Sequence, residues 1–180
     1  MALALVTAVQ GCKKVSSRQD LDNIHSLEKK TEENRIQVGK GAAKLDQQLL
    51  ADLGAAYVKF ADQYPDAPES PEFLFRAGEL YSNELNDFTK AIEIFQRNYE
   101  KYPEHETAGN ALFFVAYLYN NSVHDLIKAE KYYKEFLEHY PNHKMAQSAQ
   151  FELASLGMPV DAVFEKLMGN DSTAKDSGLR

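Results

Sequence analysis

The sequence of 180 residues has one cysteine, six prolines, nine glycines and no tryptophan. A single thiol excludes an intramolecular disulfide and a cysteine-based zinc site, so packing must hold the fold together. Because the few glycines and prolines gather at a small number of places, the composition favours a helical protein. The length predicts one domain, large enough to bury about two-thirds of the surface that the extended chain exposes.

The charges are distributed unevenly behind a net charge of −7. Residues 13–44 contain eight Lys or Arg and five Asp or Glu, a balance of +3, whereas residues 45–180 contain 12 against 22, a balance of −10. Nucleic-acid binding depends on basic side chains that displace counterions from phosphates. The acidic body therefore disfavours DNA or RNA as a partner.

The first twelve residues, MALALVTAVQGC, form a short apolar run that ends at the only cysteine, Cys12. This run is shorter than the roughly 20 residues of a transmembrane helix. Its length and its small-residue ending match the apolar region of a secretory signal. No Lys or Arg precedes Cys12, so either the basic start of a signal lies upstream of Met1 or the segment is not a signal.

Beyond Cys12, the composition divides the chain into three further segments. Residues 13–41 are polar and charge-mixed, which predicts a flexible tether because their apolar surface is too small to offset the entropy lost on ordering. The alternative is a short helix with Leu21, Ile24 and Leu27 on one face. Residues 42–168 are expected to fold as the body, and residues 169–180 to form a disordered tail.

The body contains a repeated pattern that aligns without gaps. Two features recur at one constant step, the dipeptide Tyr-Pro and a phenylalanine, at Tyr64, Tyr102 and Tyr140 and at Phe75, Phe113 and Phe151. The register holds over two full periods. It therefore predicts that the same local structure is formed more than once.

Each repeat predicts a pair of helices. Apolar positions spaced i, i+3, i+4, i+7 indicate first helices over residues 71–82 and 108–120. The second helix begins after Asp87 or Asp125, whose side chain can cap it, and ends at the tyrosine before proline. Small residues on facing positions let the two helices approach closely, namely Gly78 and Ala91 in one unit and Ala116 and Ala129 in the next.

This pattern resembles the tetratricopeptide repeat (TPR), a helix-turn-helix unit with a small residue in each helix, an aromatic residue after each and a closing proline. The resemblance covers residues 42–157 and implies an all-α, TPR-like helix-turn-helix solenoid. Its 38-residue period departs from the usual 34 by one residue in the turn within a unit and three in the link between units. Gly39 and Gly41 are expected to break the first helix of the first unit. A final helix from Pro159, with Val163 and Phe164 on its apolar face, is expected to cap the open end of the stack.

Residues 9–12, Val-Gln-Gly-Cys, resemble the processing box of bacterial lipoprotein signals, whose cysteine becomes the lipid-modified N-terminus. Gly11 fits the small residue before the cut, whereas Gln10 departs from the family's preference for a small side chain. The resemblance implies lipid attachment at Cys12 and membrane anchoring through several acyl chains. Lys13 is not the aspartate that retains such proteins at the inner membrane, which implies the outer membrane. A body on the periplasmic face of that membrane is a separate expectation, which Lys13 does not decide.

Lipid-anchored TPR chains whose units end in Tyr-Pro are similar, at family level, to envelope lipoproteins of Gram-negative bacteria. These include the helical-repeat lipoproteins of the β-barrel assembly and Tol-Pal systems. The resemblance implies a scaffold or adaptor that binds protein or peptide partners in outer-membrane protein assembly. The alternative is a cytosolic TPR adaptor without a lipid anchor.

In the TPR family, first-helix residues between the packing positions line a partner groove. Carried over to this sequence, the groove is a phenylalanine column flanked by polar side chains, namely Phe75, Glu79, Phe113, Tyr117, Asn120 and Phe151. Aromatic anchors in such a groove suit an extended segment or a helix of a partner. The alternative is that the phenylalanines pack between units, because a core position repeats as faithfully as a groove position.

Nothing in the sequence has the pattern of a catalytic or small-molecule site. His139 and His143 are four residues apart, but Pro141 between them prevents a shared helical face. No carboxylate–histidine spacing resembles a metal site, and neither a glycine-rich phosphate loop nor a nucleophile elbow occurs. The sequence therefore predicts no enzyme activity, no cofactor and no metal.

Overall fold

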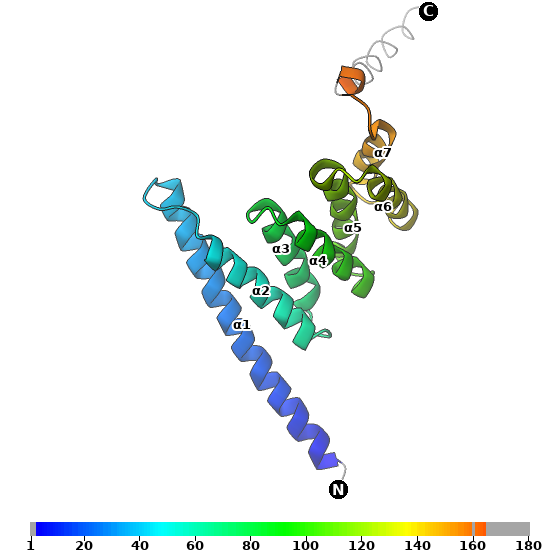
Figure 1. Ribbon diagram of the computed structural model, residues 1–180. Coiled ribbons are helices and arrows are strands. Elements are labelled where there is room, and N and C mark those ends of the chain that lie inside the picture. Colours follow the sequence, from blue (N-terminus) through cyan, green and yellow to red (C-terminus); the bar gives the residue numbers. More distant parts are fainter. Residues whose placement is uncertain (1–2, 160, 165–180) are drawn as a thin grey trace, which may run out of the picture. The chain divides into compact units, whose positions relative to one another are not determined.

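The structure is a computed structural model that describes residues 3–159 and 161–164, with side chains from Ser17 onward. All regular elements in these residues are helices, and no strand occurs among them. Figure 1 shows their order along the chain: α1 (Leu3–Gly39), α2 (Gln47–Gln63), α3 (Ser70–Asn83), α4 (Phe88–Lys101), α5 (Glu106–Leu118), the π-helix η1 (Tyr119–Val123), α6 (Leu126–His139) and α7 (Ala146–Ser155).

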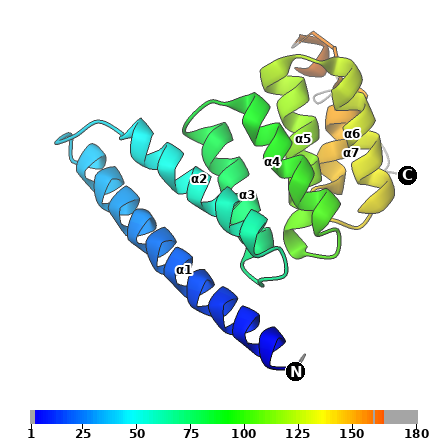
Figure 2. The same cartoon turned by 60° about the horizontal axis from the view of Figure 1, so that its bottom comes forward.

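The chain forms two compact units, and the boundary between them lies between Val115 and Ala116, inside α5. In the first unit, α2 packs on α1, α3 packs on α2 and α4 packs on α3. Both views show α1 and α2 side by side and antiparallel (Figures 1 and 2). Helices that are neighbours in the sequence are therefore neighbours in space, which is the arrangement of a helical repeat.

Aromatic rings dominate the core of the first unit. Tyr57 on α2 stacks on Phe73 of α3, with ring centroids 5.0 Å apart, and Phe60 meets the same ring edge-on at 5.1 Å. Phe95 on α4 stacks on Phe114 of α5 at 5.4 Å. Each ring comes from the apolar face of an amphipathic helix, so the repeat pattern of the sequence becomes a continuous core.

Residues 13–39 belong to helix α1 instead of the flexible tether that the sequence predicts for residues 13–41. This agrees with the alternative of a helix with Leu21, Ile24 and Leu27 on one face, because Ile24 is buried and the two leucines are half-buried. Ile24 and Thr31 are each only 1% exposed, so this side of α1 is packed. Asp20 adds polar contacts with α2, because it accepts a 2.8 Å hydrogen bond from the Tyr64 hydroxyl and lies 3.6 Å from Lys59 Nζ. The fully buried residues of α1 thus come once every two turns, and ion pairs flank them. This buried stripe is narrower than the apolar face of a typical amphipathic helix.

Helix α1 also shows that the expected break of the first helix at Gly39 and Gly41 is wrong. Gly39 and Gly41 do not remove the first helix of the first helix pair, because α1 runs up to Gly39 and pairs with α2. Gly41 follows with φ +72°, in the left-handed region of backbone space, which glycine adopts without strain because it has no Cβ. The two glycines therefore end the helix and turn the chain.

The 38-residue repeat is confirmed at the ends of the second helices. Helices α4 and α6 begin at equivalent positions of the repeat and end at equivalent positions. The carboxylates of Asp87 and Asp125 accept hydrogen bonds from the backbone N–H groups three residues on, at 3.1 and 3.0 Å. The tyrosines before proline end their helices with φ of −128° or −129° and ψ between 53° and 60°, at Tyr64, Tyr102 and Tyr140.

A wide turn joins the two helices of each pair. Asn86 and His124, which are equivalent in the repeat, both have positive φ, at 55° and 61°. The aspartate after each donates its backbone N–H to the carbonyl of a tyrosine six residues earlier, Tyr81 or Tyr119, at 2.9 Å. This looser winding, which forms the π-helix η1 in the second unit, accommodates the longer turn of this repeat.

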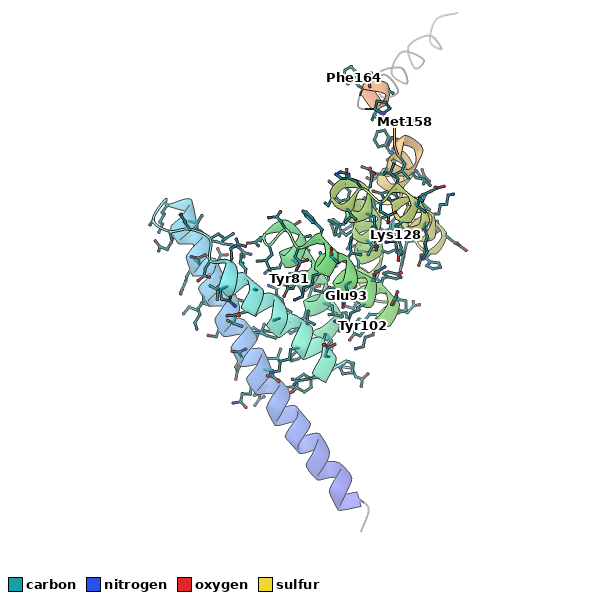
Figure 3. All side chains as sticks on the ribbon, in the orientation of Figure 1. Tyr81, Glu93, Tyr102, Lys128, Met158 and Phe164 are labelled. Carbon is teal, nitrogen blue, oxygen red and sulfur yellow. The ribbon has the colours of Figure 1, made fainter. Side chains whose placement is uncertain are left out.

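In the second unit, α6 and α7 pack on each other around small and aromatic side chains, with Ala129, Tyr133, Phe136 and Ala149 buried. Beyond α7, residues 161–164 are helical, and the Val163 N–H donates to the Pro159 carbonyl at 3.0 Å. Phe164 is 61% exposed, although the sequence places it on the apolar face of the capping helix (Figure 3). The remainder of that predicted helix, residues 165–168, and the predicted tail, residues 169–180, lie outside the described residues.

Candidate protein-binding surface

The phenylalanines of the predicted groove lie on α3, α5 and α7. Phe75 and Phe151 are half-buried, whereas Phe113 is 5% exposed. The ring centroid of Phe75 lies 5.5 Å from that of Phe95 and 6.0 Å from that of Phe114. The burial of Phe113 and the aromatic packing of Phe75 support the alternative that these rings belong to the core. A binding role for the column stays a prediction.

The polar members of the predicted groove differ in what they contact. In the second unit, Asn120 donates from Nδ2 to Glu152 Oε2 at 3.1 Å, so its side chain already joins η1 to α7. Tyr117 is 39% exposed and presents part of its ring to solvent. In the first unit, Glu79 lines a pocket. These three side chains therefore do not make one surface within either unit.

The pocket that contains Glu79 has a volume of about 240 Å³ and lies between α1 and α3. Its apolar wall comes from Leu53 and Tyr57 of α2 and Leu80 of α3, all of them nearly inaccessible to solvent. The rest of the lining is polar or charged, namely Arg35, Arg76, Glu79, Asn83 and Glu84. A hollow lined mainly by charged and polar side chains, with a smaller apolar area beside them, can recognise a side chain of defined charge.

Both arginines of the pocket are paired with glutamates. Arg76 Nη1 lies 2.6 Å from Glu28 Oε1 of α1, and its guanidinium lies 4.9 Å from the centre of the Tyr57 ring. Arg35 of α1 pairs with Glu84, directly after α3. The Tyr57 hydroxyl donates to Glu28 Oε1 at 2.7 Å, so Glu28 ties α1 to both α2 and α3. Burial, and then this hydrogen bond, raise the pKa of Tyr57 well above its usual value, which keeps the hydroxyl protonated as a donor.

Glu79 is the remaining charge in the pocket. Its side chain is half-buried, and its carboxylate makes no hydrogen bond or ion pair with any side chain that the structure describes. Burial, followed by the negative charge of Glu72, raises the pKa of Glu79, and the positive charge of Arg76 opposes them with a smaller effect. A carboxylate in this position is less well solvated than it is in water and has no full counter-charge.

The sequence predicts Glu79 as a groove residue but does not indicate its neighbours on α1, because residues 13–41 have the composition of a tether. One signal of a packed helix is present there. Ile24 and Thr31 are seven residues apart, as are Glu28 and Arg35, and seven residues make two helical turns. This spacing places the buried pair on one face of α1 and the charged pair on another.

A second hollow, of about 280 Å³, lies between α2 and α4 and includes Tyr81 and Lys90. Lys90 Nζ is 4.4 Å from the centre of the Tyr81 ring, and the repeat-equivalent Lys128 Nζ is 5.0 Å from the Tyr119 ring. Figure 3 labels Tyr81 and Lys128, one member of each pair. This lysine–tyrosine contact recurs at the same place in both repeats. Its cation–π attraction therefore has a structural explanation, because it joins the two helices of each repeat.

Two histidines in the links between helix pairs, His105 and His143, make hydrogen bonds to the backbone. His105 and His143 each accept a backbone N–H at Nδ1, from Thr107 at 3.3 Å and from Met145 at 3.2 Å, where α5 and α7 begin. Burial, and then the charge of Lys144, lower the pKa of His143, which favours the neutral ring that can accept. In the portion of the chain that the structure describes, no three His, Cys, Asp or Glu side chains are grouped to hold a metal ion.

Cys12 lies along the backbone of α1, but its side chain is outside the described residues. Lipid attachment at this position therefore stays a prediction. Within residues 3–159 and 161–164, no helix has both the length and the apolar character that crossing a bilayer requires.

Residues 72–105 match the family model described as the tetratricopeptide repeat. The matched segment contains nearly all of α3 and the whole of α4, with the Tyr-Pro dipeptide that closes them. No curated protein matches the chain. The fold is thus an all-α, TPR-like helical repeat, as the sequence predicts. Repeats of this type are typically scaffolds for protein interactions rather than enzymes.

Proposed function

We propose that this chain is a lipid-anchored TPR scaffold that binds protein or peptide partners during the assembly of the cell envelope. The TPR-type repeat carries the proposal, because such repeats act as protein-interaction adaptors. The pocket between the first helices of two neighbouring pairs, α1 and α3, adds a place where a partner side chain fits. The location that we propose is the outer membrane, with the body on its periplasmic face.

The order of features at the N-terminus supports the anchor. An apolar run, a small residue at Gly11 and then Cys12 follow one another, and the polar contacts of α1 with α2 involve Asp20 and later residues. A chain that begins at Cys12 therefore keeps these contacts. Lipidation at Cys12 is compatible with these contacts, because Cys12 precedes Asp20 in the chain.

Metabolic labelling with a fatty acid tests the anchor. The expected result is incorporation into the wild-type chain and none into Cys12→Ser, because the acyl groups are attached through the sulfur. Cell fractionation of the same two strains should recover the wild type with membranes and the variant in the soluble fraction. Absence of label from both proteins, with recovery of both in the soluble fraction, favours the alternative of a cytosolic TPR adaptor.

Photo-crosslinking in cells tests partner binding. A photoreactive residue in place of Asn83, which lines the pocket, is expected to capture a partner protein. The matched control is the same residue in place of Glu93, which is exposed on α4 and does not line the pocket (Figure 3). Equal capture from both positions contradicts a binding surface at the first helices.

A further inference from the structure

The charges around the pocket between α1 and α3 do not balance. Arg76 is neutralised by Glu28 and Arg35 by Glu84, and in each pair the arginine is 41% exposed and the glutamate 25%. The four charged residues that line the pocket, Arg35, Arg76, Glu79 and Glu84, sum to zero. With Glu28, which pairs with Arg76 from outside the lining, the group has a net charge of −1, and Glu79 is the acid of this group that has no ion pair. The rest of the body is itself acidic.

The geometry restricts what this charge can bind. An anionic ligand would have to displace Glu28 or Glu84 from its arginine and would add its own charge to that of Glu79. A metal ion lacks ligands, because the described residues hold no group of three suitable side chains. A basic side chain, which has a positive charge at the end of an apolar stem, is not repelled by Glu79 and does not need three ligands.

The size and the walls of the pocket suit one side chain. A volume of about 240 Å³ lies below the range of about 300–1,000 Å³ that is usual for sites of drug-sized ligands. Most of the accessible lining is polar, and Leu53, Tyr57 and Leu80 contribute a smaller apolar part. The methylenes of a lysine or arginine can lie along this apolar part while the charged head pairs with an acid.

We propose that this pocket binds one arginine or lysine side chain of a protein partner, with Glu79 as the counter-charge. This inference rests on the partner binding proposed above and is independent of the lipid anchor. It also explains why a half-buried carboxylate without a partner stands on α3, since binding sites commonly hold groups that reduce the stability of the free protein. The partner's cation supplies the ion pair that the free chain lacks.

Selection of peptides from a random phage-displayed library on the full chain tests the inference. The expected result is a family of binding peptides with Arg or Lys at one fixed position. Replacement of that arginine by citrulline, which has the same shape and no charge, should weaken binding at least tenfold. Glu79→Gln should weaken the arginine peptide to a similar extent, whereas Glu93→Gln, the same charge change on exposed α4, should stay within twofold of wild type.

The outcomes separate this inference from the proposed function. Selected peptides without a fixed basic position, or equal binding of the citrulline peptide, overturn the pocket assignment while peptide binding stands. Binding of the arginine peptide by Glu79→Gln within twofold of wild type overturns it as well. A library that yields no binding peptide contradicts peptide recognition itself and the pocket with it. The citrulline comparison leaves the protein unchanged, so a folding defect of a variant cannot produce its result.

Discussion

The side-chain amide of Asn98 on α4 donates a hydrogen bond of 2.6 Å to the backbone carbonyl of Pro71, at the start of α3. Asn98 is fully buried, and its oxygen accepts a hydrogen bond from the Thr107 hydroxyl at 3.0 Å. One side chain thus joins α3, α4 and the start of α5 within the first unit. Because a buried amide is stable only when its partners are in place, this contact fixes the register of the three helices.

Replacing Asn98 by alanine should therefore destabilise the protein by about 2 kcal/mol, since a buried void forms and Thr107 loses a partner. Urea unfolding measures the change. Glu100→Ala, on the exposed side of the same helix, is the control and should unfold at nearly the wild-type midpoint. Similar midpoints for Asn98→Ala and wild type would contradict a structural role for the amide.

The close packing of Gly78 against Phe95 gives a second prediction. A Cβ added at Gly78 would lie 2.5 Å from the Phe95 ring, so Gly78→Ala should destabilise the first unit by about 1–3 kcal/mol despite the better helix propensity of alanine. The smaller side chain of Phe95→Leu should relieve the clash. A double-mutant cycle of these two changes is expected to show a favourable coupling of at least about 0.5 kcal/mol, and simple additivity would argue against the contact.

Ile24 tests whether α1 belongs to the folded body. Because its side chain is 1% exposed, Ile24→Ala should lower the free energy of unfolding by about 2–4 kcal/mol. Ile36 lies on the same helix but is 45% exposed, so Ile36→Ala should change stability by less than about 0.5 kcal/mol. If the two variants unfold alike, residues 13–41 behave as the flexible tether that their composition predicts.

Phe113 and Tyr117 separate core from surface on α5. Truncation of the buried Phe113 to alanine should cost about 3–5 kcal/mol of stability. Tyr117→Ala removes a ring that is 39% exposed and should cost less, about 1–2 kcal/mol. Loss of crosslinked partner in Tyr117→Ala, in a protein that is still folded, would support its place in the predicted groove. A stable Phe113→Ala that loses the partner would instead make Phe113 a groove residue.

The raised pKa of Glu79 predicts a pH dependence of stability. The folded protein holds this proton more tightly than the unfolded chain does, so the ionised carboxylate lowers stability at pH 7, and the loss is relieved as the pH falls through the folded pKa. Since the group is half exposed, water limits the effect to about a few tenths of a kcal/mol. Glu79→Gln should therefore be slightly more stable than wild type at pH 7 and equal to it at about pH 4. Urea unfolding at both pH values measures this, and a less stable variant at pH 7 contradicts the assignment.

The sequence predicts the repeat well because local chemistry determines it. Asp87 and Asp125 cap helices through contacts three residues away, and a proline ends each second helix at the tyrosine before it. Such signals act within one turn of helix and recur in each unit of the repeat. They require no knowledge of which helices pack together.

The sequence predicts α1 and the pocket poorly because both depend on distant partners. Glu28 binds Tyr57, 29 residues away, and Arg76, 48 residues away. In isolation, residues 13–41 have too little apolar surface to order. The packing of Ile24 and Thr31 and the polar contacts of Asp20 and Glu28 with later helices supply further stabilisation. A composition window averages over these contacts and therefore cannot detect them.

The packing of α1 sets how far the body can stand from a bilayer in the lipid-anchored form that we propose. Twenty-nine unstructured residues, from 13 to 41, would reach about 100 Å. With Asp20 already seated on α2, only the seven residues from Lys13 to Gln19 separate the acyl chains from the body, a span of about 10 Å as helix and about 25 Å when extended. The body would then be held close to the membrane, whereas the pocket beside Arg35 lies about 35 Å from Cys12 along the axis of α1.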